Sequence, residues 1–215
     1  MKTQHHSSKG AREQGFELSY RLAWEQLSRI GDIKAQCHRS GAQCVGLNEM
    51  IIDYLNEPYH ITIPDAEISL TDSKTEVPLK DKILILHYFT LAKGTPRTGI
   101  SINYKQLPGG VSYFPAFSQR AINPFVKHFG EKPELLIELS AKLGGYEADH
   151  GDVSVTIDAF NHVPVTFALW RGDEEFSPSG AILFDANISD YLSTEDITVL
   201  CETIVWKLVR SIPST

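Results

Sequence analysis

Acidic side chains gather in the last third of the chain, in a pattern that could bind a metal ion. The stretch LWRGDEEFSPSGAILFD (169–185) carries Asp173, Glu174 and Glu175 between two apolar runs and ends at Asp185. Hard cations such as Mg²⁺ or Ca²⁺ take several carboxylate oxygens. One hypothesis therefore makes Asp173, Glu175 and Asp185 the metal ligands of a hydrolase. The other interpretation is structural, because an aspartate that follows a glycine can accept hydrogen bonds from the amides of a turn.

His87 is the histidine best placed for chemistry. It lies in the apolar run LILHYF beside Tyr88. An imidazole there is either hydrogen-bonded at the edge of the core or turned into a pocket as a metal ligand, an axial ligand or a general base. The other histidines have no ligand spacing, since H-E-x-x-H and H-x-H motifs are absent. Both interpretations of His87 remain open on the sequence alone.

The cysteines Cys37, Cys44 and Cys201 are too few for an iron–sulfur cluster, which normally takes four thiolates. The segment CHRSGAQC places Cys37, His38 and Cys44 near one another but lacks the paired spacing of structural zinc sites. An odd, widely spaced set indicates reduced thiols in a cytoplasmic protein. Such thiols pack as small apolar side chains, and the sequence assigns Cys37 and Cys44 no further role.

Motifs for nucleophilic catalysis and phosphate binding are absent from the sequence. There is no G-x-S-x-G elbow. The glycines of LPGGVSY and LGGY lack the spacing of a P-loop or a dinucleotide-binding loop. Gly109 and Gly110 are expected instead to supply positive φ for a turn.

The composition excludes several classes of protein. A chain of 215 residues with 42% hydrophobic and 22% charged residues fits one globular domain. A net charge of −7 without a basic run argues against nucleic-acid binding, and no apolar run reaches the ~20 residues that span a bilayer. The start, MKTQHHSSKGAREQG, lacks the apolar core of a secretory signal. Residues 1–15 are therefore predicted to be a flexible polar leader, and residues 16–215 a single domain.

The first half of the chain mixes helical and strand patterns. Apolar residues recur every three or four positions from Phe16 to Ile30, which predicts an amphipathic helix that Gly31 ends. Asp32 is predicted to cap a short second helix. Closely spaced turn residues between positions 50 and 70 favour a strand meander, although MIIDYL could also form a helical turn. The segment 79–94 is apolar on most sides, so it should be a buried central helix.

The second half continues this mixture. TGISINYKQL alternates like a strand, and AFSQRAINPFVKHFG and KPELLIELSAKLGG have helical patterns. DVSVTIDAF, VPVTFALW and AILF predict antiparallel strands, the first two joined at Asn161-His162. Ser193 and Asp196 have the spacing of a capping box before an amphipathic C-terminal helix. The predicted fold is α+β, with mostly antiparallel sheet, a buried central helix and an amphipathic C-terminal helix.

Four stretches together resemble one family of anaerobic bacteria and archaea, the domain of unknown function 3786. They are ILILHYFTLAKGTPRTG (83–99), LPGGVSYFPAFSQR (107–120), LGGYEADHGDVS (143–154) and PVTFALWRGDEEFSPSGAILFDANISDYLSTEDI (164–197). Some members of this family look joined to a small four-cysteine iron–sulfur module, which is similar to that of corrinoid iron–sulfur proteins. This chain lacks such a set of four cysteines. The resemblance implies an accessory role near corrinoid, tetrapyrrole or one-carbon metabolism in anaerobes.

The resemblance also implies which positions would line a family pocket. These positions are His87, Tyr88, Thr98, Gly99, Gly109, Gly110, Tyr113, Arg120, Trp170, Asp173 and Glu175. Within this set, His87 and the aromatic side chains would supply an axial ligand and apolar walls. His87, Asp173, Glu175 and Asp185 are the candidate metal ligands.

Three functional hypotheses follow. The first is a cofactor-binding accessory protein that takes a corrinoid, a haem or another bulky ligand, or that works with an iron–sulfur or corrinoid partner protein. The second is a metal-dependent hydrolase that uses the carboxylates of Asp173, Glu175 and Asp185. The third is a non-catalytic protein-interaction domain, and a homo-oligomer is compatible with each of the three.

Overall fold

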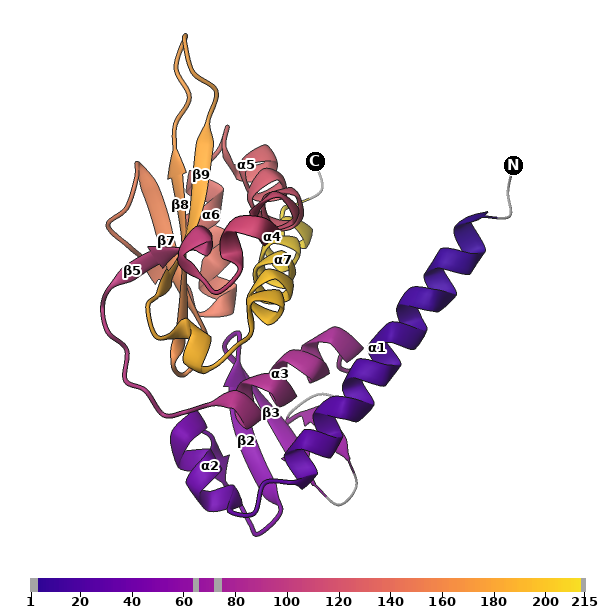
Figure 1. Cartoon of the computed structure of the whole chain (residues 1–215). Coiled ribbons are helices and arrows are strands. Elements are labelled where there is room, and N and C mark those ends of the chain that lie inside the picture. Colours follow the sequence, from indigo (N-terminus) through magenta and orange to yellow (C-terminus); the bar gives the residue numbers. More distant parts are fainter. Residues whose placement is uncertain (1–3, 64–65, 72–74, 214–215) are drawn as a thin grey trace.

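A computed structural model describes residues 4–63, 66–71 and 75–213 and arranges them around two antiparallel sheets (Figure 1). The first sheet has the strand order β1-β2-β3-β4, and the second has the order β5-β9-β8-β7-β6. Helices alternate irregularly with these strands along the chain. The predicted α+β class with antiparallel sheet is therefore confirmed.

The first sheet and three helices make up the N-terminal half. A tight turn joins β2 to β3, where Leu55 and Asn56 both have positive φ, at 52° and 65°, as the favoured two-residue hairpin turn requires. The strand interpretation is thus confirmed for residues 50–54, and Leu55 belongs to the turn. The elements are α1 (Gln4–Ser28), α2 (Ile33–Ser40), β1 (Gln43–Cys44), β2 (Glu49–Tyr54), β3 (Glu57–Thr62), β4 (Glu67–Leu70) and α3 (Leu79–Leu91).

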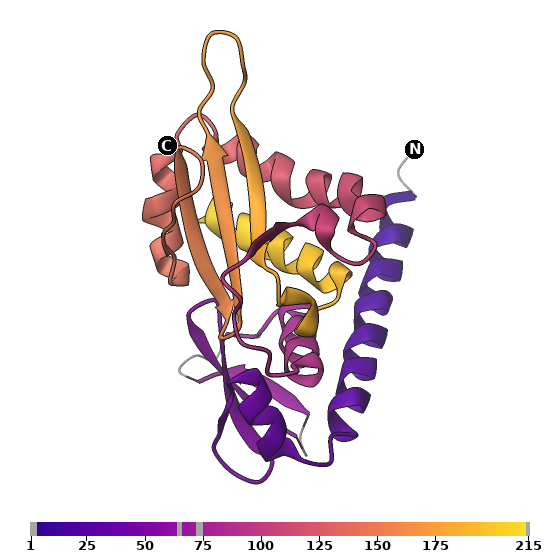
Figure 2. The same ribbon diagram turned by 60° about the vertical axis from the view of Figure 1, so that its left-hand side comes forward.

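Helix α1 begins at Gln4, so it extends through most of the segment predicted to be a flexible leader. Within residues 14–28 of α1, Ala23 and Leu27 are buried, and both belong to the predicted apolar stripe. They lie where α1 packs against α3. Figures 1 and 2 show the N-terminal end of α1 extending well beyond α3.

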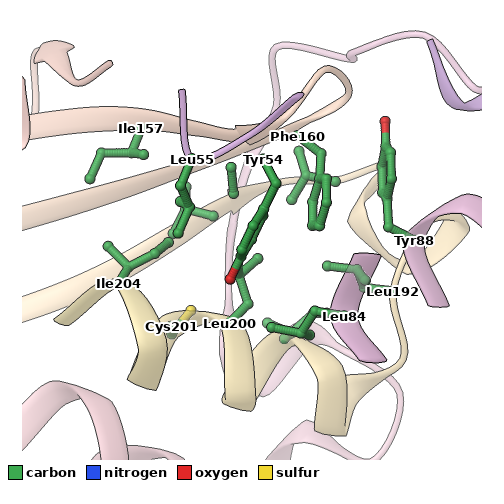
Figure 3. Packing of buried hydrophobic residues seen from close by; sticks show 14 of the residues in the cluster. Tyr54, Leu55, Leu84, Tyr88, Ile157, Phe160, Leu192, Leu200, Cys201 and Ile204 are labelled. Atoms are coloured by element: carbon green, nitrogen blue, oxygen red, sulfur yellow. The ribbon is translucent and has the colours of Figure 1, made fainter. Parts of the chain in front are cut away.

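Helix α3 lies between the two sheets and is the predicted buried central helix. Side chains on most of its circumference are buried, as its apolar sequence requires. The ring of Tyr88 stacks on Phe160 of the second sheet, with centroids 4.0 Å apart (Figure 3). One hydrophobic core therefore joins both halves of the chain.

The second sheet carries its helices on one side. Helices α4 to α7 lie against the same face in Figures 1 and 2, and the opposite face presents polar side chains such as Thr156 and Thr166, whose hydroxyls are hydrogen-bonded at 2.7 Å. The elements are β5 (Ser101–Asn103), α4 (Gly110–Phe117), α5 (Asn123–Phe129), α6 (Glu134–Ser140), β6 (Tyr146–Glu147), β7 (Val153–Phe160), β8 (Val163–Trp170), β9 (Ser179–Asp185) and α7 (Thr194–Arg210), with a π-helical turn (Ser118–Ile122) between α4 and α5.

Helix α7 starts with the predicted capping box. The Ser193 side chain accepts a hydrogen bond from the Asp196 amide, and the Asp196 side chain accepts one from the Ser193 amide. Two otherwise unsatisfied amides of the first turn are paired in this way. The capping box therefore fixes the orientation of the Asp196 carboxylate.

Candidate functional site

The carboxylate of Asp196 holds the imidazole of His87. Its Nδ1 lies 2.7 Å from Oδ1 of Asp196 in the first turn of α7. The His87 side chain is 24% exposed and the Asp196 side chain 10% exposed. The contact ties α3 to α7, and it leaves Nε2 as the ring nitrogen through which His87 can act on a ligand.

Tyr88 is a core residue. It is fully buried, stacks on Phe160, and donates a hydrogen bond from its hydroxyl to the Ser40 carbonyl at 2.6 Å. Burial is the largest cause of the raised pKa of its phenol. Tyr88 therefore joins α2 to α3 and does not serve as the wall of an open pocket.

Thr98, Gly99 and Asp185 form a structural clamp. The Asp185 carboxylate accepts hydrogen bonds from the Thr98 amide and hydroxyl, the Gly99 amide and the Asn187 amide, at 2.7 to 3.0 Å. Burial acts to raise the pKa of Asp185, but these hydrogen bonds outweigh it and the pKa lies below its usual value. Asp185 thus holds the extended segment before β5 against the end of β9.

Gly109 and Gly110 have backbone roles. Gly109 has φ of 70° at the start of α4, in the left-handed region that favours glycine. A Cβ on Gly110 would lie 1.9 Å from the Tyr104 carbonyl oxygen, so no other residue fits without movement of the backbone. The predicted positive φ is confirmed for Gly109 and wrong for Gly110, which is needed for the close approach to Tyr104 instead.

Tyr113 and Arg120 lie on the helices that follow. Tyr113 is exposed on α4. Arg120 pairs with Glu195 at 2.9 Å and with Glu202 at 2.8 Å, both on α7. Arg120 therefore fastens the π-helical turn to α7, and its charge is already balanced.

The acidic loop 171–178 at the tip of the β8–β9 hairpin is braced by Asp173. Oδ1 of Asp173 accepts hydrogen bonds from the amides of Glu175 and Phe176, at 2.8 and 2.7 Å. The structural interpretation predicted such contacts for this carboxylate. Glu175 is exposed, as is Trp170 at the base of the loop. A hollow of about 610 Å³ beside the loop is lined by residues 171–178 and by residues 130–131, and most of these residues are exposed.

The predicted metal site does not form. Among residues 4–63, 66–71 and 75–213, no three His, Cys, Asp or Glu side chains gather closely enough to hold a metal ion. Asp173 and Asp185 are instead used by separate amide clusters. The described part of the chain therefore does not bring together the three carboxylates that the hydrolase hypothesis requires.

A second hollow has walls of a different kind, and none of the predicted residues lines it. It has a volume of about 450 Å³ and lies between β3, the strand β4, the start of α3 and the end of α7. We call it the β3–α7 hollow. Its lining is mainly apolar, and its charged groups are Glu57, Glu76 and Lys207. The full lining is Glu57, Pro58, Tyr59, Leu70, Thr71, Thr75, Glu76, Val77, Pro78 and Lys207.

Asp81 lies directly behind this lining. Its amide donates to the Pro78 carbonyl at 2.9 Å, and its Oδ2 lies 3.7 Å from Nζ of Lys207. The Asp81 side chain is 2% exposed, whereas that of Lys207 is 26% exposed. Asp81 also occupies the first turn of α3, where the helix macrodipole favours a negative charge.

The contacts of the Asp81 carboxylate are long. The Tyr54 hydroxyl donates to Oδ1 at 3.4 Å, and Figure 3 shows the Tyr54 ring directed with its hydroxyl towards α7. Burial is the largest effect on the pKa of Asp81 and raises it, while Lys207 and Lys80 oppose that rise. A buried acid with a raised pKa beside a mainly apolar hollow is the combination that marks binding sites.

Tyr59 connects this acid cluster to the open hollow. Its ring lies 5.7 Å from that of Tyr54, and its hydroxyl donates to Oε2 of Glu57 at 3.3 Å. Burial raises the pKa of Tyr59, and so does the nearby charge of Glu57. The hydroxyl therefore stays protonated at neutral pH, and the Glu57 carboxylate keeps its other oxygen for a ligand.

Sequence reasoning missed this site because its residues lie far apart in the chain. Asp81 has the position of an ordinary acidic residue in the first turn of α3, and Lys207 that of an ordinary basic residue in the last turn of α7. The available signal was that Asp81 lies in the segment predicted to be a buried central helix. A charged residue there needs a partner.

No helix of the described part of the chain combines the length and the apolar character needed to span a membrane. Residues 32–207 match the model of a family described as domain of unknown function, DUF3786. No curated protein and no solved structure matches the chain. The matched range includes both sheets, α3 and Lys207, and it leaves out α1.

Proposed function

The chain belongs to the DUF3786 family, and we propose that it is a ligand-binding protein whose site is the β3–α7 hollow. The observation that carries the proposal is a mainly apolar hollow of about 450 Å³ that Lys207 helps to line, with the buried carboxylate of Asp81 behind it. Binding pockets for small molecules are typically ~300–1,000 Å³, mostly apolar, and equipped with a few polar groups.

The charges around the hollow select the ligand. Asp81 balances Lys207, so the remaining charges on the lining are the carboxylates of Glu57 and Glu76. Pro58, Leu70 and Val77 supply apolar contact surface. The ligand class is a small molecule with an apolar body and one protonated amine, which a negatively charged hollow attracts.

The test uses phenethylamine as the probe and hydrocinnamate as a control of similar shape and opposite charge, in calorimetric titrations. We expect heat of binding from the amine alone. The double variant Glu57→Gln/Glu76→Gln should bind phenethylamine with an affinity about tenfold lower, which corresponds to ~1.4 kcal/mol of binding free energy. The matched control is Glu147→Gln, because Glu147 is exposed on β6 and lies outside the hollow lining.

Three results would contradict the proposal. The first is equal binding of both probes, and the second is binding of hydrocinnamate alone. The third is amine binding that persists unchanged in the double variant, because the probe would then lie elsewhere on the chain.

The tetrapyrrole-like ligand implied by the family resemblance is a second proposal, and one observation favours it. A carboxylate bound to one ring nitrogen commonly orients a histidine whose other nitrogen binds a metal, and Asp196 holds His87 in this way. The neighbouring aromatic candidates fit less well, since Tyr88 is buried in the core and Tyr113 and Trp170 belong to α4 and β8.

Added haem or cobalamin tests this second proposal by the visible spectrum. His87→Ala should reduce the spectral shift, whereas His128→Ala on α5 should leave it unchanged. Absence of any shift with either cofactor would refute a role for His87 as an axial ligand.

A further inference from the structure

Two of the three cysteines meet where α2 turns into β1. Helix α2 ends at Gly41, which has φ of 70°, and the Ala42 amide donates to the Cys37 carbonyl at 3.0 Å. This closure is a common helix C-terminal motif and reverses the chain. The reversal brings β1 into contact with α2, so that Cys44 packs against the hydrophobic cluster that contains Cys37 and its thiol lies beside that of Cys37.

The two thiols have different surroundings. Cys37 is buried in the hydrophobic core, whereas Cys44 is partly exposed at the edge of that core. Burial raises the pKa of Cys37 to about 12, and the hydrogen bond with Cys44 adds to the rise. Cys37 therefore remains protonated at neutral pH, and Cys44 is the thiol that a reagent in solution reaches first.

Packing alone accounts for one of these cysteines but not for their contact. A buried thiol behaves as a small apolar side chain, which explains Cys37 and also Cys201, buried in α7. Such packing does not require that the partly exposed thiol of Cys44 lie against the thiol of Cys37. The pairing is the feature that points to chemistry.

We propose that Cys37 and Cys44 form a redox-active dithiol, which a peroxide converts into an intramolecular disulfide. Cys44 attacks the peroxide oxygen, the O–O bond breaks, and Cys44 becomes a sulfenic acid while the peroxide is reduced to water or an alcohol. The Cys37 sulfur then attacks the Cys44 sulfur. The S–S bond forms, the S–O bond breaks, and the hydroxide leaves as water with the proton of Cys37.

The disulfide would fasten α2 to β1 beside Ser40, whose carbonyl anchors Tyr88 of α3.

The experiment treats the fully reduced full-length chain with a stoichiometric amount of hydrogen peroxide. Intact mass should fall by two hydrogen atoms, and the thiols titrated after denaturation should fall from three to one. A digest should contain a peptide cross-linked between Cys37 and Cys44. The mass loss should disappear in Cys44→Ser and persist in Cys201→Ser, the matched control with a buried lone thiol.

Cys44 is partly exposed, so Cys44→Ser keeps the test valid even if Cys37→Ser fails to fold. Gain of oxygen at Cys44 without cross-linking would overturn the proposal, because Cys37 would then fail to resolve the sulfenic acid. A disulfide between two chains, seen as a dimer on a non-reducing gel, would overturn it as well.

Discussion

Replacing Asp185 by asparagine tests whether this carboxylate is a structural clamp. The carboxylate accepts four hydrogen bonds, from the amide and hydroxyl of Thr98 and from the amides of Gly99 and Asn187. A hydrogen bond to a charged group contributes about 1.5–3 kcal/mol. Asparagine keeps one acceptor oxygen and turns an NH₂ group towards the Gly99 amide. One charged hydrogen bond is lost and the others become neutral, so Asp185→Asn should cost about 3 kcal/mol.

The pH dependence of this cost has a definite sign. The folded-state pKa of Asp185 is lowered, despite burial, by its hydrogen bonds from Asn187, Thr98 and Gly99. The stabilisation is therefore fully present above the unfolded-state pKa of about 3.9. It is lost as pH falls through the lower folded-state pKa. Urea denaturation followed by circular dichroism should show a constant difference between wild type and variant from neutral pH to about pH 5, and a shrinking difference at still lower pH.

Glu175→Gln is the matched control, because Glu175 is exposed on the hairpin loop. Its free energy of unfolding should stay within about 0.5 kcal/mol of wild type. The clamp argument fails if Asp185→Asn is equally neutral. It also fails if the cost appears only when a divalent cation is present, since Asp185 would then act as a metal ligand.

Three further predictions concern the core and the β3–α7 hollow. Tyr88→Phe keeps the ring stack but loses the hydrogen bond to Ser40, so the free energy of unfolding in urea should fall by about 1 kcal/mol. Gly110→Ala should cost at least ~3 kcal/mol or prevent folding, because its Cβ would meet the Tyr104 carbonyl; a thermal melt like that of wild type would contradict this. The folded-state pKa of Asp81 is raised by burial, so wild type should gain stability as pH falls through it, and Asp81→Asn should lack this gain in urea titrations at several pH values.

The elements were predictable where local chemistry decides them. The capping box at Ser193 and Asp196 needs only residues three positions apart, and the structure has it. The turn at Gly109 depends on a φ that glycine favours. The buried central helix followed from its apolar circumference. The first half of α1 was missed, because its polar sequence carries no apolar stripe.

The site could not be predicted in the same way, because chemical type does not reveal how many partners a side chain has. His87, Tyr88 and Asp185 were selected as candidate ligand-binding or metal-binding residues, and the structure instead bonds each of them to a distant element. Asp196, Ser40 and the segment at Thr98 are those elements. Pairings across such sequence separations arise from tertiary packing, which periodicity does not encode.

Asp185 and Asp81 show how a buried carboxylate of structural use differs from one available for function. Both are almost completely buried, so each loses the hydration of its charged form. Asp185 regains that energy from four donors at 3.0 Å or less, and its pKa is lowered. Asp81 has contacts of 3.4 and 3.7 Å, and its pKa is raised. A protonated amine in the β3–α7 hollow adds a positive charge near Asp81 and should lower the pKa of Asp81, because it opposes the effect of burial as Lys207 does. In the pH range over which Asp81 titrates, binding should accordingly release protons, which titrations in buffers of different ionisation enthalpy would detect.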